Sequence, residues 1–292
     1  MQSTTSPGVI HRLTRRLKTA GIASTLLAAA ATAQAGLVGL SSGRPGALYQ
    51  INSSTGVASG AVTVSGVDTS LVGLEYLGGK FYASDVFGSG GLLFGTVDPV
   101  TGTYTGINNQ NVSANWHGLA GNESAQLLYT IDINNNNSLT SITTAGVVSV
   151  IGQTSPSISG RGMAYDDTNG ILYATSDANQ LFRVDTTTAL ATLIGDLGFS
   201  GNVVGLAYDE DAQSLFANAG NAGSSALYTL NVTTGAGTLV GLNGPLATSE
   251  FALDGLAWVP NAQVPEPSAL ALVGLALAGL GLGGFFGPRL GD

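Results

Sequence analysis

The chain has no cysteine and only two histidines among its 292 residues. The lack of cysteine excludes disulfide scaffolds, thiolate zinc sites, iron–sulfur clusters and cysteine nucleophiles. His11 lies in a segment interpreted below as a leader, so only His117 remains after it, and a site with several histidine ligands is excluded. Charged residues make up only 9% of the chain, whereas 43 residues are glycine. Because an interior glycine costs a helix about 1 kcal/mol relative to alanine, this composition disfavours helical folds.

The N-terminal end has the pattern of a secretory signal peptide. Four basic residues precede position 19, an apolar run extends from Ala20 to Ala31, and Ala33-Gln34-Ala35 forms a small-residue cleavage site. The alternative is a membrane anchor, but a spanning helix needs about 20 apolar residues and this run is shorter. We therefore expect a signal peptide over residues 1–35, with cleavage between Ala35 and Gly36.

Residues 36–260 contain a tandem repeat. A motif of glycine, two apolar residues and an aromatic residue recurs in three clear and two looser copies, whose leading glycines are 45, 44, 43 and 50 residues apart. Three further runs follow each copy, in which apolar and aromatic residues alternate with Thr, Ser and Asn as in β-strands. The recurring aromatics are expected to pack between the repeats. The copies are Gly73–Tyr76, Gly118–Gly121, Gly162–Tyr165, Gly205–Tyr208 and Gly255–Trp258.

The repeat predicts an all-β, five-bladed β-propeller, because four-stranded units of this length in tandem are typical of propeller blades. Four complete units run from about residue 72 to 241, and the fifth copy, Leu253–Val259, stands alone near the C-terminal end. Its three missing strands are expected at Leu37–Leu40, Ala47–Ile51 and Val57–Val64. Pairing the two ends in one shared blade closes the ring and removes open sheet edges. The units resemble bacterial propeller repeats found in secreted proteins of unassigned function.

A polar turn is expected between the third and fourth strands of a unit. Asp98-Pro99-Val100-Thr101-Gly102 is one example, and Asn52 to Gly56 and Asn231 to Gly235 follow the same pattern. Asp or Asn begins such a turn by accepting hydrogen bonds from its own backbone, and glycine ends it with a positive φ.

The C-terminal end is organised as a sorting signal. Pro265-Glu266-Pro267 closes a linker over residues 261–267, residues 268–286 form an uncharged stretch of 19 residues, and a tail over residues 287–292 carries Arg289. As a helix this stretch is about 28 Å long, which matches the hydrocarbon core of a bilayer. We therefore expect a transmembrane helix over residues 268–286.

This order of parts resembles the PEP-CTERM sorting signal of Gram-negative bacteria. The resemblance implies that Pro265, Glu266 and Pro267 are recognised by an exosortase, and that the helix anchors the chain in the inner membrane until processing at the envelope. It also implies a final location at the cell surface or outside the cell, because such proteins accompany exopolysaccharide and biofilm production. The alternative is a tail-anchored protein in which Pro-Glu-Pro is a rigid spacer.

The charge of the body limits its partners. Residues 36–260 hold four basic and sixteen acidic residues, a net formal charge of −12. This excludes nucleic acid, whose phosphates need a basic surface, and disfavours anionic lipid headgroups. No cofactor is expected. Asp166-Asp167 and Asp209-Glu210-Asp211 recur after a first strand and are interpreted as solvated turns, with a surface calcium site as the alternative.

The residue before each repeated glycine forms the most suggestive set of ionisable groups. In a propeller the first strand of each blade lines the central channel, and three of the five residues at this position are ionisable, namely His117, Arg161 and Asp254. One interpretation is that they bind an anionic or sugar ligand, with Trp116 as a stacking surface, and Glu75, which replaces the alanine of the related units, is a further candidate. The favoured interpretation is that these groups pair with one another or with water and only fill the channel.

The sequence favours a non-catalytic binding or structural module of the cell surface or exopolysaccharide matrix. One alternative is a carbohydrate-active enzyme at the channel, with Glu75 and Asp254 as its two carboxylates. No serine lies in a G-x-S-x-G elbow, which disfavours a serine hydrolase. The other alternative is a protein–protein interaction scaffold that uses the faces of the blades.

Overall fold

In the computed structural model the described residues are 36–85, 94–107, 114–221, 224–246 and 253–260. The expected signal peptide with Ala33 and Ala35, the Pro265-Glu266-Pro267 motif, the span over residues 268–286 and the tail lie outside these ranges. Within these ranges there is no helix that is long and apolar enough to cross a membrane.

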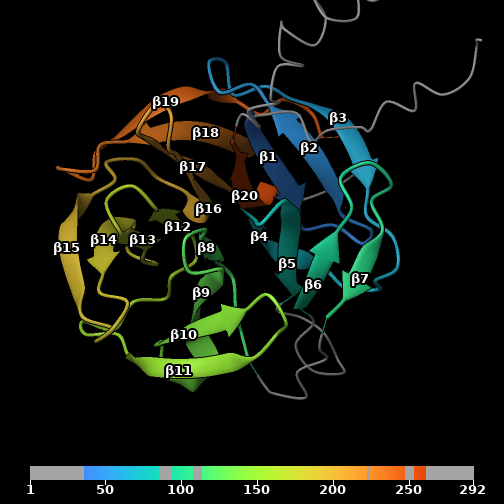
Figure 1. Ribbon diagram of the computed structural model, residues 1–292. Coiled ribbons are helices and arrows are strands. Elements are labelled where there is room, and N and C mark those ends of the chain that lie inside the picture. Colours follow the sequence, from blue (N-terminus) through green and yellow to red (C-terminus); the bar gives the residue numbers. More distant parts are fainter. Residues whose placement is uncertain (1–35, 86–93, 108–113, 222–223, 247–252, 261–292) are drawn as a thin grey trace, which may run out of the picture. The chain divides into compact units, whose positions relative to one another are not determined.

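The described residues form a five-bladed β-propeller, as the repeat predicted (Figure 1). Each blade is a four-stranded antiparallel sheet.

Blade 1 consists of β4 (Leu71–Leu77), β5 (Lys80–Asp85), β6 (Phe94–Val97) and β7 (Tyr104–Gly106). Blade 2 consists of β8 (Ala120–Asn122), β9 (Leu127–Asp132), β10 (Ser138–Thr143) and β11 (Val148–Gln153), with the short 3-10 helix Ile133–Asn135 after β9. Blade 3 consists of β12 (Met163–Asp166), β13 (Ile171–Thr175), β14 (Gln180–Val184) and β15 (Ala191–Asp196). Blade 4 consists of β16 (Asn202–Asp209), β17 (Ser214–Asn221), β18 (Ser224–Leu230) and β19 (Gly237–Leu242).

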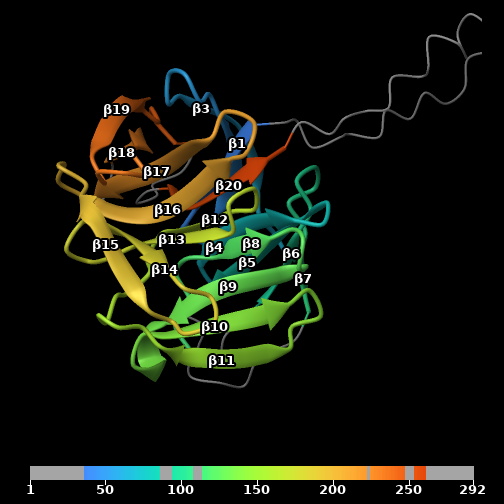
Figure 2. The same cartoon turned by 60° about the vertical axis from the view of Figure 1, so that its left-hand side comes forward.

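Blade 5 joins the two ends of the described chain, which confirms the predicted closure. It consists of β20 (Leu253–Val259), β1 (Gly36–Ser41), β2 (Ala47–Ile51) and β3 (Ala58–Thr63). β1 and β20 pair antiparallel, with Gly36 opposite Val259 and Leu40 opposite Gly255. In Figures 1 and 2 the strands β4, β8, β12, β16 and β20 lie innermost, while β3, β7, β11, β15 and β19 lie at the rim.

The repeated glycine allows the innermost strands to approach one another. A Cβ added at any of the five glycines would lie 2.6 to 3.0 Å from an atom of the apolar residue that follows the glycine of the next blade. At Gly205 it would lie 2.9 Å from both the Cβ and the backbone nitrogen of Leu256. Only glycine fits such a separation, which explains why each unit begins with this residue. The pairs around the ring are Gly73–Leu119, Gly118–Met163, Gly162–Leu206, Gly205–Leu256 and Gly255–Leu74.

Aromatic side chains pack between neighbouring blades, as expected from their recurrence. Three stacked pairs join the second strand of one blade to the first strand of the next, with ring centroids 5.8, 6.0 and 6.4 Å apart. Stacked aromatic pairs at these distances add to the energy of area burial. The pairs are Tyr129–Tyr165, Tyr173–Tyr208 and Phe216–Trp258.

The polar turns between the third and fourth strands also form as predicted. Asp98 Oδ1 accepts hydrogen bonds from the backbone N–H groups of Val100 and Thr101, both at 2.8 Å, and Gly102 has a φ of +70°. Asn52 and Asn231 cap their turns in the same way, and Gly56 and Gly235 have positive φ.

Candidate functional site

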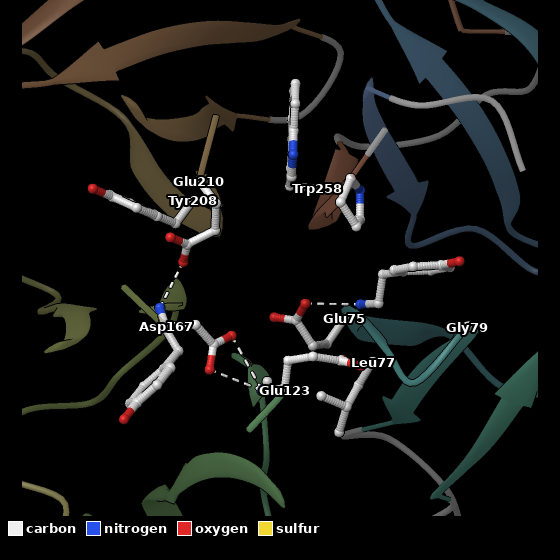
Figure 3. Close-up of a pocket in the computed structure, with 12 residues that line it drawn as sticks. Glu75, Leu77, Gly79, Glu123, Asp167, Tyr208, Glu210 and Trp258 are labelled. Carbon is white, nitrogen blue, oxygen red and sulfur yellow. Dashed lines mark hydrogen bonds between the residues drawn. The ribbon is translucent and has the colours of Figure 1, made fainter. Parts of the chain in front are cut away.

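A cavity of about 430 Å³ lies where the innermost strands of all five blades end (Figure 3). Its wall contains the residue three positions after each repeated glycine, which is aromatic in four blades and Gly121 in blade 2. The residue five positions after the glycine is acidic in three blades and also lines the cavity. We call this cavity the acidic cup. It is defined by the carboxylates Glu75, Glu123, Asp167 and Glu210 and by the rings Tyr76, Tyr165, Tyr208 and Trp258.

Three of these carboxylates are held by backbone N–H groups of the preceding blade. Glu123 Oε2 accepts from the N–H of Gly78 at 2.9 Å, and Asp167 accepts from the N–H of Glu123 at 3.0 and 3.1 Å. Glu210 Oε1 accepts from the N–H of Asp167 at 2.6 Å, and Glu210 Oε2 accepts from the hydroxyl of Thr168 at 2.7 Å. A hydrogen bond to an ionised acceptor is stronger than one between neutral groups. These bonds therefore link blades 1 to 4 and fix three carboxylates at the rim of the cup.

Glu75 occupies the space left by the missing aromatic residue of blade 2. A Cβ at Gly121 would lie 3.0 Å from Glu75 Cγ, so a larger residue at position 121 would collide with this side chain. Glu75 Oε1 accepts a hydrogen bond from the backbone N–H of Tyr76 at 2.8 Å. Burial raises the pKa of Glu75 to about 8, against the opposing effect of the N–H groups of Tyr76 and Gly121. Glu75 is therefore mostly protonated at neutral pH.

The electrostatic field in the cup is negative. The charges of Asp167 and Glu123 add to the effect of burial on the pKa of Glu75. Burial also raises the pKa of Asp167, and the charge of Glu123 contributes to that increase. None of the described residues that line the cup is Lys, Arg or His. The described part of the cup thus holds several carboxyl groups and no basic side chain that could compensate them.

The residues singled out before the repeated glycine lie at the other end of the innermost strands. His117 and Arg161 precede β8 and β12, and Asp254 is the second residue of β20. Arg161 Nε donates to Asp177 Oδ1, which is the one ion pair among the described residues. We call Arg161, Asp177, His117 and Asp254 the arginine cluster.

The charges of the arginine cluster act on one another. The pKa of His117 is lowered to about 4, chiefly by burial and also by the charge of Arg161, while the charge of Asp177 acts in the opposite direction. Burial raises the pKa of Asp254, and both a hydrogen bond with Ser42 and the charge of Arg161 oppose this increase. The charge of Arg161 therefore acts on both His117 and Asp254. Its direct partner is Asp177, which the sequence reasoning missed.

Two expectations for this region are wrong. Trp116 is only 1% exposed and lies edge-on to Phe94, with ring centroids 6.4 Å apart, so its ring is part of the core and is no stacking surface for a ligand. Glu75 lines the acidic cup whereas Asp254 does not, so these two carboxylates do not flank one bound substrate. The acids that share a cavity with Glu75 are Glu123, Asp167 and Glu210.

Among the candidate calcium ligands, Asp167 and Glu210 line the acidic cup, whereas Asp166 and Asp209 serve as turn residues. Asp166 Oδ1 accepts from the backbone N–H of Asn169 at 2.9 Å, and Asp209 Oδ1 accepts from the N–H groups of Asp211 and Ala212 at 3.0 Å. No group of three or more metal-ligating side chains occurs in the described part of the chain.

Comparisons with known proteins identify the fold alone. No family model matches the chain, and no curated protein matches it. Among solved structures, a chain of the nidogen–laminin complex is similar with a TM-score of 0.54 and 12% identity, over 77% of this chain and 98% of that chain. A protein of unknown function from Bacteroides thetaiotaomicron has a TM-score of 0.45 and 15% identity, over 70% of this chain and 50% of that chain. Kuenenia stuttgartiensis hydrazine synthase has a TM-score of 0.40 and 13% identity, over 60% of this chain and 50% of that chain.

Proposed function

We propose that this protein is an exported, non-catalytic β-propeller that binds glycan in the acidic cup and serves at the cell surface or in the exopolysaccharide matrix. The observation that carries this proposal is the composition of the cup, which combines four aromatic rings with carboxyl groups in a cavity of about 430 Å³. Cavities of this size and lining are typical of small-ligand sites. Aromatic rings offer flat apolar faces to a sugar ring, and carboxylates accept hydrogen bonds from its hydroxyl groups.

The chain ends support the proposed location. The basic start, apolar run and Ala33-Gln34-Ala35 site favour export, and Pro265-Glu266-Pro267 before an uncharged stretch favours sorting by an exosortase. The net charge of −12 over residues 36–260 suits a protein that remains soluble outside the cell.

The proposal is tested with the full-length chain in a mild non-ionic detergent and polysaccharide from the producing strain. We expect the protein to sediment with the polysaccharide without releasing new reducing ends. Trp258→Ala should abolish sedimentation, because it removes one aromatic wall of the cup. Asp68→Asn is the matched control, since Asp68 is exposed and does not line the cup. Sedimentation that survives Trp258→Ala would contradict binding at the cup.

A carbohydrate-active enzyme at the same cup is the second candidate function. It is favoured by the pairing of Glu75, whose pKa is raised to about 8, with neighbouring carboxylates. Glycosidases use one protonated and one ionised carboxyl group on opposite sides of the scissile bond. Release of reducing ends that disappears in Glu75→Gln would establish this function in place of the first.

A further inference from the structure

The acidic cup and the arginine cluster differ in one respect that points to a ligand. In the arginine cluster a guanidinium group lies among the carboxylates, and Arg161 bonds directly to Asp177. In the cup, Glu123, Asp167 and Glu210 are fixed by backbone N–H groups, and no described lining residue carries a positive charge. Like charges held close together in a partly buried site repel one another unless a cation lies between them.

The aromatic rings of the cup are held in place by the neighbouring blades. Tyr165 stacks on Tyr129, with ring centroids 5.8 Å apart, and Tyr208 stacks on Tyr173, with centroids 6.0 Å apart. Trp258 stacks on Phe216 in the same way, with centroids 6.4 Å apart. A fixed aromatic ring attracts a cation through its quadrupole, and this attraction is strongest for tryptophan. The wall and the rim of the cup therefore favour the same sign of charge in a ligand.

We infer that the cup selects a glycan that carries free amino groups, with one sugar ammonium held among the carboxylates and the aromatic rings. This inference rests on the glycan binding proposed above and names the class of sugar. An ammonium group has three donors and no acceptor, which matches a site whose polar side chains are mainly acceptors. A neutral sugar leaves the repulsion between the carboxylates in place, and a uronic acid increases it. An N-acetylated amino sugar has the same ring without the charge, so it is the informative comparison.

Binding of an ammonium should also draw a proton from Glu75. At pH 6 Glu75 is protonated, because its pKa is about 8, and a sugar amine is charged. A cation beside Glu75 favours the carboxylate form, so a proton is released as the ligand binds. The other titratable groups that line the cup are Tyr76, Glu123, Tyr165, Asp167, Tyr208 and Glu210.

The test measures binding of three hexasaccharides to the full-length chain by titration calorimetry at pH 6. The probes are the glucosamine hexamer, its fully N-acetylated counterpart and the neutral glucose hexamer with the same β-1,4 linkage. We expect the glucosamine hexamer to bind on the order of tenfold more tightly than the other two, as one charge-assisted contact provides. Titrations in two buffers of different ionisation enthalpy should reveal proton release for this probe alone.

Two variants separate recognition in the cup from general attraction to an acidic protein. Glu75→Gln keeps the shape of the side chain and should abolish the proton release and reduce the preference, while Asp68→Asn should retain both. Tyr165→Leu removes one ring and should weaken binding of the glucosamine hexamer. It keeps the inference testable if Glu75→Gln does not fold. Equal affinity for all three hexamers would overturn the inference and leave glycan binding in place. Binding to none of them would overturn both proposals, and a preference that is unchanged in Glu75→Gln and Tyr165→Leu would place the amine elsewhere.

Discussion

The two ends of the propeller axis both carry ionisable groups, but negative charge is partly balanced by a basic side chain at only one of them. The arginine cluster contains Arg161, which pairs with Asp177 and opposes the increase that burial causes in the pKa of Asp254. The charges of the cluster are therefore partly balanced within the chain. The acidic cup contains four carboxyl groups and no basic lining residue among those described. Buried charges that a chain balances by itself are explained by structure, whereas an unbalanced set in a cavity indicates a ligand. The cup is for this reason the stronger candidate site, although the residues of the cluster are the more prominent ones in the sequence.

The largest effect on stability is expected from a substitution at a repeated glycine, which lies between the arginine cluster and the acidic cup. Gly205→Ala would place a Cβ 2.9 Å from the backbone nitrogen of Leu256. A backbone atom cannot rotate away from this contact as the end of a flexible side chain could. We expect a loss of about 3 kcal/mol in the free energy of unfolding, measured by urea denaturation. The control is Gly152→Ala, where the added Cβ would lie 3.7 Å from Ala189 Cβ and the change should be within about 0.5 kcal/mol. Equal effects of the two substitutions would mean that the blades do not meet closely at the axis.

The second effect concerns the pH dependence of the cup. The pKa of Glu75 rises from 4.5 to about 8 on folding, so between these values the folded state holds a proton that the unfolded state has lost. Stability therefore falls as the pH rises through this window. Glu75→Gln should remove this slope, so that the variant gains about 2 kcal/mol relative to the wild type between pH 6 and pH 7.5. Urea denaturation at both pH values checks this, and parallel slopes would show that Glu75 is not desolvated.

The third effect has the opposite sign and belongs to the arginine cluster. The pKa of His117 falls from 6.5 to about 4 on folding, so between these values the unfolded state binds more protons than the folded state. Its contribution to stability is lost as the pH falls through this window. His117→Gln should reduce the acid sensitivity by about 1 kcal/mol, measured by denaturation at pH 6.5 and pH 5.5. A variant as acid-sensitive as the wild type would contradict the burial of this imidazole.

The smallest effect is expected for the exposed partner in the cluster. The side chain of Asp177 is 62% exposed, so Asp177→Asn should cost less than about 0.5 kcal/mol of stability. The pKa of His117 should nevertheless respond, falling in Asp177→Asn and rising in Arg161→Gln, because the two charges act on it in opposite directions. NMR titration of the His117 ring protons measures both changes. Movement in the same direction in the two variants would show that His117 lies outside the field of this ion pair.

Much of the fold could be predicted because each repeat has the same pattern of residues and therefore folds into the same kind of blade. The same glycine, apolar and aromatic positions return in each blade, so Leu253–Val259 could be assigned as an isolated first strand, and β20 has these bounds. The closure followed because the missing strands had to lie at the other end of the chain, where β1 pairs with β20. What the pattern did not explain was the glycine itself, whose role depends on the distance to the next blade.

The candidate site was harder to predict, because it depends on where side chains outside the strand centres point. Trp116 precedes β8 in an irregular segment, so the alternation of a strand did not apply to it and its burial was missed. Asp167 and Glu210 were noticed as turn residues, but Glu123 was not placed with them. Counting five positions from each repeated glycine would have aligned these three acids. The four aromatic residues of the cup were already aligned by the motif, but they were predicted only to pack between the repeats. The hydrogen bonds that link the acids between blades have no signal in the sequence.

The most direct test of the difference between the two ends is a crystal structure of the full-length protein with the glucosamine hexamer. We predict density for a sugar ring against Trp258, with its amino group within hydrogen-bonding distance of Glu75 or Asp167, and an unchanged arginine cluster. Density for the sugar at Arg161 and Asp254, or on the outer face of a blade with an empty cup, would contradict the assignment of the acidic cup as the binding site.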